Sequence, residues 1–375
     1  MKILFFLEYY YPNIGGVETL FKNLIDNLAQ ENHQITIITA RPYPDSPLKE
    51  YEGNITIIRI PVRSRYIFTF LGFFYLIRHI SKGDFIHTTS YNAAIPAFFA
   101  GKLFRKKVIV TFHEVWDQLW FQLPDMGKIG QWSHYLFEQF LLKLPFDKFI
   151  GVSHSTSNNL IKAGVSKERV TTIYNGIDYK DFKVKKIKSS TNSNEFVFTY
   201  FGRLGISKGL DLLIPAAQQI CSKYPNMRLQ LIIPKVPKPF LDKILTAIND
   251  SALKDCTIIK HELSFENLKQ TLVQSNCVVI PSYSEGFCFA AVECIALDVP
   301  LISSDQAALK EVVSGQFIKM EEFSVTALIK AMEAALAGNW EVTPIKHFLL
   351  TDTIEQYKAL YDNLMQVNKQ QMVDV

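Results

Sequence analysis

The sequence has no segment apolar enough to span a membrane, and it lacks the common metal-binding motifs. Its longest apolar run, residues 66–77, has twelve residues and ends at Arg78, whereas a transmembrane helix needs about 20. Neither H-E-x-x-H nor D-x-D occurs, so we expect no metal or other cofactor. The cysteines, at positions 221, 256, 277, 288 and 294, show no C-x-x-C spacing. This favours reduced thiols in the cytosol over a disulfide framework or a zinc site.

The N-terminus also lacks the features of a secretory signal. Residues 3–7 are apolar, but Glu8 follows at once and no small-residue cleavage site is present. We therefore interpret this segment as a first β-strand and predict a cytoplasmic protein. With 375 residues, 48% hydrophobic and 20% charged, the chain has the composition of a soluble globular protein and the length of two domains.

Acidic residues are scarce between Gly53 and His113. Asp84 is the only acidic residue in this span, which contains nine lysines and arginines. Within this span, residues 59–82 combine four arginines with several aromatic residues. One interpretation is a buried helix with a basic edge. The other, which we favour, is a surface that docks on an anionic membrane or an anionic acceptor, giving a peripheral location at the inner face of the cell membrane. No nucleic-acid-binding motif accompanies the charge, so no nucleic-acid partner is expected.

Apolar runs alternate with helical patterns along most of the chain, which predicts an α/β protein with doubly wound parallel sheets. A polar, basic stretch without periodicity, residues 183–195, is the best candidate linker between two such halves. Ligands bind such sheets at the carboxyl ends of the strands. Strands are predicted at 2–7, 35–39, 55–60, 85–88, 108–112, 149–153 and 170–174 in the first half, and at 196–201, 228–233, 257–260, 277–280 and 300–303 in the second.

In each predicted half, a glycine-containing turn follows the first strand. Gly15 and Gly16 open the first helix and would let its N-terminus approach a phosphate, although a plain tight turn is the alternative. The turn lacks the G-x-G-x-x-G dinucleotide fingerprint. In the second half, Arg203 and Lys208 lie in a loop punctuated by glycines. Two cations before a helix suit a diphosphate, and a solvated basic loop is the alternative.

Three further candidates follow predicted strands. His113 directly follows the strand at 108–112 and is either a site residue or a structural histidine. Glu285 lies in the turn after the strand at 277–280, and Glu293 lies in the helix that comes next. Carboxylates at such a turn are placed to accept hydrogen bonds from hydroxyls, as sugars offer. Taken alone, they also fit a surface turn and a solvated helix face.

Together these motifs resemble the retaining glycosyltransferases of family 4, which have the GT-B fold. The resemblance rests on Glu285 and Glu293 in an E-x7-E pattern, on Arg203 and Lys208 ahead of them, on 15–18 (Gly-Gly-Val-Glu) and on 175–178 (Asn-Gly-Ile-Asp). It implies two Rossmann-like doubly wound domains facing across a cleft. The implied domains are 1–182 with a returning C-terminal helix at 350–375, and a donor domain at 183–349.

The resemblance also implies a role for each site residue. Arg203 and Lys208 would bind the diphosphate of a UDP- or GDP-sugar, with help from Gly15 and Gly16. Glu285 would hold the hydroxyls of the donor sugar, together with the backbone amides of Gly286, Phe287 and Cys288. Glu293 would accept hydrogen bonds from the ribose, and His113 would contact the sugar. The implied reaction moves a hexose to a glycan or lipid-linked acceptor with retention of configuration.

Cys288, Asp298 and the pair Ala307-Ala308 stand where the family commonly has glycine, and 233–237 replaces a glycine-rich loop. The cations and both glutamates are retained, so an active enzyme is expected. Two alternatives stay open. One is a nucleotide-sugar epimerase or a phosphorylase on the same fold, and the other is a non-catalytic partner protein that binds nucleotide sugar.

Overall fold

The computed structural model describes residues 1–124, 126–184 and 195–373, and the chain divides into two compact units. Unit 1 consists of Met1–Gln122, Gly127–Gly176 and Leu349–Val375, and unit 2 consists of Leu123–Met126 and Ile177–Phe348. The division after Gly176 comes slightly before the boundary predicted at residue 182. Most of the predicted linker, residues 185–194, lies outside the described residues.

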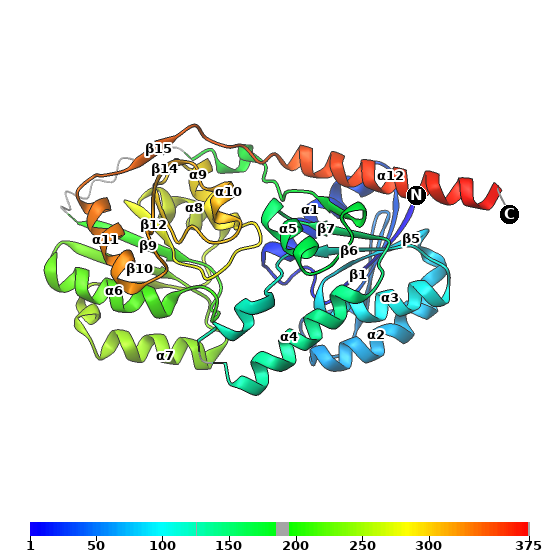
Figure 1. The fold of residues 1–375 in the computed structure, drawn as a ribbon, viewed down its shortest axis with the longest axis horizontal. Helices are drawn as coiled ribbons and strands as arrows, with labels where there is room; N and C mark the ends of the chain where they lie inside the picture. The colour runs from blue at the N-terminus through cyan, green and yellow to red at the C-terminus, as the bar shows by residue number, and fades with distance from the viewer. Residues whose placement is uncertain (125, 185–194, 374–375) are drawn as a thin grey trace. The chain divides into compact units, whose positions relative to one another are not determined.

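Within the described residues, unit 1 is built on an eight-stranded sheet in the order β3-β4-β2-β1-β5-β6-β7-β8. Figure 1 labels four of its strands, β1, β5, β6 and β7. Its strands pair in parallel, except for β3, which runs antiparallel to β4 at the edge. The strands are β1 (Lys2–Leu7), β2 (Gln34–Ala40), β3 (Lys49–Glu52), β4 (Ile55–Ile60), β5 (Phe85–Thr89), β6 (Val108–Phe112), β7 (Lys148–Gly151) and β8 (Val170–Thr172). The doubly wound prediction is confirmed, but β3 was missed.

Apart from the edge strands β3 and β8, the strands of unit 1 are mostly buried because both faces of the sheet are covered. Successive side chains of a strand point to opposite faces. Phe5 accordingly packs edge-on against Phe21 of α1, while Phe6 stacks on Phe68 of α2. The covering helices are α1 (Gly16–Gln30), α2 (Arg65–His79), α3 (Ala94–Leu103), α4 (Lys128–Lys143), α5 (His154–Lys162) and α12 (Leu350–Val373).

Helix α2 is the segment for which two interpretations were open. It buries Phe68 and Leu76 against the sheet and leaves Tyr66, Phe70 and Phe74 exposed, at 74%, 67% and 54% of their surface. Helix α2 therefore has one buried face and one exposed face, and docking of the exposed face on a membrane or an acceptor stays a prediction.

Helix α12 completes the core of unit 1 through a buried histidine. His87 on β5 hydrogen-bonds Tyr361 Oη through Nδ1 at 2.6 Å and Thr111 Oγ1 through Nε2 at 2.8 Å. Burial lowers the pKa of His87 to about 3, so the ring is neutral and one nitrogen donates while the other accepts. Tyr357 and Tyr361 are fully buried, and this packing fixes the last helix of the chain on the first unit.

Unit 2 holds a seven-stranded sheet, counted over its described residues, in the order β11-β10-β9-β12-β13-β14-β15. Only β15, at the edge, is antiparallel to its neighbour. The strands are β9 (Phe196–Phe201), β10 (Met227–Ile232), β11 (Thr257–Lys260), β12 (Cys277–Ile280), β13 (Leu301–Ser303), β14 (Gly315–Lys319) and β15 (Glu341–Thr343). Strands β14 and β15 were not predicted.

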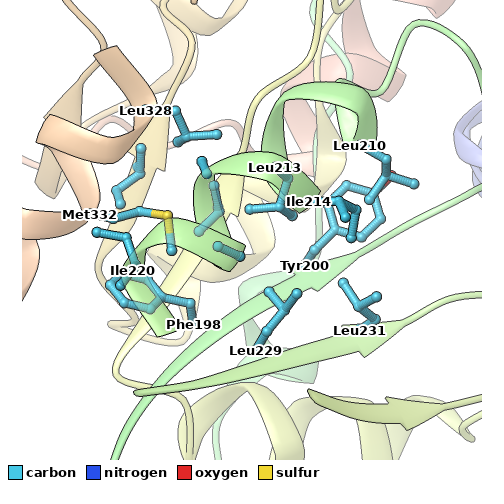
Figure 2. Packing of buried hydrophobic residues seen from close by; sticks show 14 of the residues in the cluster. Phe198, Tyr200, Leu210, Leu213, Ile214, Ile220, Leu229, Leu231, Leu328 and Met332 are labelled. Atoms are coloured by element: carbon cyan, nitrogen blue, oxygen red, sulfur yellow. The ribbon is translucent and has the colours of Figure 1, made fainter. Parts of the chain in front are cut away.

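The core of unit 2 lies between this sheet and helices α6 and α11 (Figure 2). Leu213 and Ile220 of α6 point toward Phe198 and Leu229 on the strands, and α11 closes the cluster with Met332. The helices of this unit are α6 (Leu210–Lys223), α7 (Lys238–Asn249), α8 (Phe265–Val273), α9 (Phe289–Ala296), α10 (Leu309–Val312) and α11 (Val325–Leu336).

One expectation about the cysteines is wrong. Cys221, in α6, forms a disulfide with Cys256, 35 positions along the chain. The 3-10 helix at Ala252–Asp255 packs on α6 and brings the two Cα atoms to 6.8 Å, within the range that a disulfide spans. Spacing along the sequence does not reveal such a pair. The other three cysteines are free and buried.

Helices that are both long and apolar enough to cross a membrane are absent from the part of the chain that the structure describes.

Candidate functional site

In unit 2, the two predicted motif loops extend from neighbouring strands. Strand β9 leads into the loop at 202–209, which carries Arg203 and Lys208, and β12 leads into the loop at 281–288, which carries Glu285. Strands β9 and β12 pair in parallel, and β10 lies on the other side of β9. The order of strands reverses between β9 and β12, and such a switch point is where ligands bind in open α/β sheets.

Backbone contacts hold these two loops together. The amide of Tyr283 donates to the carbonyl of Ser207 at 2.8 Å. Gly209, the N-cap of α6, has φ of +70°, and a Cβ there would lie 1.9 Å from the carbonyl oxygen of Pro281. Only glycine fits this close approach, which explains the residue at the end of the Arg203-to-Gly209 motif.

An ion pair connects the same loops. Lys208 Nζ lies 2.8 Å from Glu285 Oε1, and the two side chains are 21% and 13% exposed. The hydroxyl of Ser282 donates to the same carboxylate oxygen at 2.7 Å. The predicted diphosphate ligand and the predicted sugar ligand therefore form one charged cluster. The spacing Ser282-x-x-Glu285 could have suggested Ser282, which sequence reasoning missed.

Arg203 differs from Lys208 in its surroundings. It is exposed, and its backbone carbonyl accepts a hydrogen bond from Tyr200 Oη at 3.1 Å. Over the described residues its guanidinium has no carboxylate partner. The loop backbone is thus fixed while the side-chain charge stays available to an anion, as the predicted role requires.

Glu293 lies in α9 and is largely enclosed. Burial raises the pKa of Glu293 to about 7, so the carboxyl changes from its protonated to its ionised form near neutral pH. In the same helix burial raises the pKa of the Cys294 thiol and, at its N-cap, that of Cys288. These thiols are therefore protonated, and neither is a nucleophile at neutral pH.

Three of the four single positions at which another residue stands for the family's common glycine share a backbone conformation; the fourth, Ala308, has an ordinary φ of −67°. Cys288, Asp298 and Ala307 have φ of +73°, +56° and +48°, a region that side chains other than glycine rarely adopt. Cys288 is the N-cap of α9 and Asp298 lies just beyond its end. The turns that normally need glycine are thus retained with other residues, at a cost of about 1 kcal/mol or more each.

The remaining predicted residues lie in unit 1. Gly15 is the N-cap of α1 in an extended conformation, and Gly16 begins the helix. His113 directly follows β6, and its ring lies 6.3 Å from that of Phe21 on α1. His113 is therefore beside the helix that the two glycines open, at the carboxyl edge of the sheet. Their roles toward a donor, and the predicted cleft, stay predictions.

Comparisons with known proteins identify the family of the chain. Residues 14–181 match the family model "Glycosyltransferase Family 4", and residues 181–343 match "Glycosyl transferases group 1". The chain belongs to glycosyltransferase family 4. A relative from Arabidopsis thaliana, named as one subunit of phosphatidylinositol N-acetylglucosaminyltransferase, is 22% identical over 100% of this chain and 84% of the relative.

Solved structures show that this glycosyltransferase has the GT-B fold. The sucrose-phosphate synthase of Thermosynechococcus elongatus superimposes with a TM-score of 0.77 at 19% identity, covering 100% of both chains. The Anabaena protein Alr3699/HepE, solved in complex with UDP and glucose, gives a TM-score of 0.73 at 15% identity, with 96% of this chain and 99% of that chain covered.

The close approach at Gly209 yields a stability prediction for the glycosyltransferase. Gly209→Ala should lower the free energy of unfolding by at least about 2 kcal/mol, because the methyl group would meet the Pro281 backbone at positive φ. Urea unfolding measures this. Gly205→Ala in the same loop is the control, since the nearest atom to its Cβ is 3.8 Å away. Equal stability of the two variants would contradict the packing described.

The raised pKa of Glu293 yields a pH prediction. Between about pH 4.5 and 7 the folded state keeps a proton that the unfolded state releases, so this residue costs increasing stability as pH rises. Glu293→Gln should therefore gain up to about 3 kcal/mol relative to the native enzyme from pH 5 to 8, at about 1.4 kcal/mol per pKa unit. Urea titrations at several pH values measure the difference. The exposed Glu341→Gln should show no such trend, and a flat profile for Glu293→Gln would refute the shift.

Proposed function

We propose that this enzyme transfers a hexose from a UDP- or GDP-sugar, with retention of configuration, to a lipid-linked or glycan acceptor. The observation that carries the proposal is the joined pair of loops at the switch point of unit 2, with Arg203, Lys208 and Glu285 together. The chemistry of the set suits a charged leaving group beside a polyhydroxylated one.

Each residue would have a distinct task in this reaction. Arg203 and Lys208 would bind the diphosphate and stabilise the negative charge that grows as the bond from sugar C1 to the phosphate oxygen breaks. The acceptor hydroxyl would form the new C1–O bond on the same face and give its proton to the departing phosphate. Glu285 and the backbone of 286–288 would orient the sugar. Since the chain's own cations carry the charge, we expect activity without a metal.

The ionisation of Glu293 would affect donor binding. A carboxylate accepts hydrogen bonds from both hydroxyls of a ribose, whereas a carboxylic acid accepts less well and donates one. Because the pKa of Glu293 is about 7, donor affinity should fall as the pH drops below neutrality. This dependence is part of the proposed role of Glu293 as the ribose ligand.

The acceptor is proposed from a relative and from the surface of unit 1. The Arabidopsis relative is named for transfer to phosphatidylinositol, which favours a lipid acceptor here. Helices α2 and α3 pack together and expose large apolar side chains, among them Phe70, Phe74 and Leu103. Basic residues such as Arg78 and Lys102 accompany them. This combination suits peripheral docking on an anionic cytoplasmic membrane face.

Loss of transfer tests the central proposal. Donor candidates are first ranked by thermal shift with UDP, GDP and ADP, since a ligand at a hundred times its Kd stabilises by about 2.7 kcal/mol. With the matching labelled sugar and a membrane-lipid extract, Lys208→Ala and Glu293→Ala should each lose about 100-fold or more of kcat/KM, with or without EDTA. The exposed Lys330→Ala is the control.

Other outcomes of that assay would select the alternatives. Unchanged activity in both variants would sink the proposed roles. A product formed from donor alone distinguishes an epimerase, and cleavage that requires inorganic phosphate distinguishes a phosphorylase. Donor binding without turnover on any acceptor would favour a non-catalytic partner protein.

Membrane docking is tested separately with phosphatidylcholine vesicles that contain phosphatidic acid. The native enzyme should sediment with them at low salt and be released at high salt. Phe70→Ser with Phe74→Ser should weaken binding about tenfold, because these side chains would insert at the interface. Val342→Ser with Ile345→Ser, exposed apolar residues of unit 2, serve as the control. Equal binding by both double variants would contradict docking through α2.

A further inference from the structure

A pocket of about 250 Å³ lies at the carboxyl edge of the unit 1 sheet. Strands β1, β2 and β4 are neighbours and deliver Glu8, Arg41 and Arg63 to its walls. Their chain ends are held side by side, since the amide of Ala40 donates to the carbonyl of Glu8 and that of Arg41 to Ile60. This pocket belongs wholly to unit 1 and contains none of the residues predicted to bind the donor.

The lining of the pocket is strongly cationic. Arg41, Arg63 and Arg65 line it together with a single acidic residue, Glu8. Glu8 is 8% exposed and is fully engaged: it accepts from Arg65 Nε at 3.1 Å and Nη2 at 3.3 Å, and from Asn92 Nδ2 at 3.1 Å. The negative charge of Glu8 is therefore neutralised by Arg65, and the pocket lining keeps two positive charges.

Arg41 and Arg63 supply those two charges. Arg41 Nε donates to the carbonyl of Ser46 at 2.7 Å, which positions the guanidinium while its two terminal nitrogens stay available. Neither Arg41 nor Arg63 forms an ion pair with any carboxylate in the described ranges. Arg59 shows the contrast: it is buried, pairs with Glu50 at 2.7 Å and donates to Pro47 at 3.0 Å, so it is structural.

A helix N-terminus adds to the same field. Helix α2 begins at Arg65, with Ser64 as its N-cap, and its first turn contains no acidic residue. Residues 63–65 form part of the pocket wall, so the positive end of a 15-residue helix acts together with the guanidiniums. Side chains alone and backbone alone both favour an anion here.

The other walls are apolar or aromatic. Tyr9, Val62 and Phe68 complete the lining, which provides a surface for an organic group next to the cationic one. A free inorganic anion makes no use of such a surface, whereas an ester of that anion does.

We propose that this pocket binds a phosphate ester on the acceptor, with Arg41 and Arg63 as its ligands. Two unpaired guanidiniums match the charge of a phosphate, which planar forks bind in bidentate geometry. The assignment to the acceptor rests on the glycosyltransferase function proposed above. The anion-binding property itself does not, and the two are tested apart.

Calorimetric titration of the full chain with sn-glycerol 3-phosphate tests the pocket. The double variant Arg41→Gln with Arg63→Gln should bind at least about tenfold more weakly than the native protein, because each arginine contributes charged hydrogen bonds. The matched control is Lys162→Gln with Lys167→Gln, two exposed lysines of unit 1 that do not line the pocket. It removes the same charge and should change affinity less than about twofold. Arg41→Lys with Arg63→Lys should recover part of the affinity.

Further arms separate the sources of the signal. Inorganic phosphate that binds as tightly as the ester would overturn the acceptor assignment, and so would loss of the UDP or GDP thermal shift in the Arg41/Arg63 variant. Equal loss of ester binding in both double variants would reduce the effect to general surface charge. Binding to phosphatidic acid vesicles should fall more in the Arg41/Arg63 variant than in the control; an equal fall would overturn headgroup recognition. If no nucleotide raises the melting temperature of the native protein or of any variant, the proposed function fails. The titration with sn-glycerol 3-phosphate still shows whether the pocket binds a phosphate ester.

Discussion

The site in unit 2 depends on one ion pair, between Lys208 and Glu285. The two residues are 77 positions apart in the chain, and each comes from a different loop. The pair joins the ends of two neighbouring strands, β9 and β12. Glu285 is mostly enclosed, and a buried carboxylate without its cation is costly. The pair therefore holds the loops in place as well as placing charge in the site.

This pairing also means that the two ligand groups are electrostatically coupled. A diphosphate bound as proposed would share the Lys208 ammonium with Glu285, whereas Arg203 would meet it without a competing carboxylate in the described structure. In the proposed site, Lys208 would thus link the phosphate side to the sugar side. A neutral substitute at position 285 would change both sides at once.

The sequence allowed the central strands to be predicted closely, and the reason is burial. Strands β1, β6, β9 and β12 have the predicted bounds, because parallel strands covered on both faces appear as short apolar runs between turns. Strands β3 and β15 were missed because they are antiparallel edge strands with exposed, polar residues. The disulfide was missed because only the packing of α6 brings Cys221 and Cys256 together.

The candidate site also contains residues that could be predicted from the sequence and residues that could not. Arg203, Lys208 and Glu285 were found because they follow apolar runs, and strand ends meet at one edge of a sheet. The contact of Ser282 with Glu285 and the presence of Arg41 and Arg63 in one pocket were not predicted, because they depend on how the loops and strands are placed in space. The replacement of glycine at Cys288, Asp298 and Ala307 was visible in the sequence, but only the backbone showed that left-handed turns are retained there.

The burial of α12 has a consequence for the order in which the protein is made. Unit 1 requires Tyr357 and Tyr361 over His87, yet all but four residues of unit 2 lie between Ile177 and Phe348 and leave the ribosome before them. Domains generally fold as units during synthesis. The second unit can therefore finish folding while the first still exposes an apolar strip on its sheet. The N-terminal half of this enzyme is begun first and completed last.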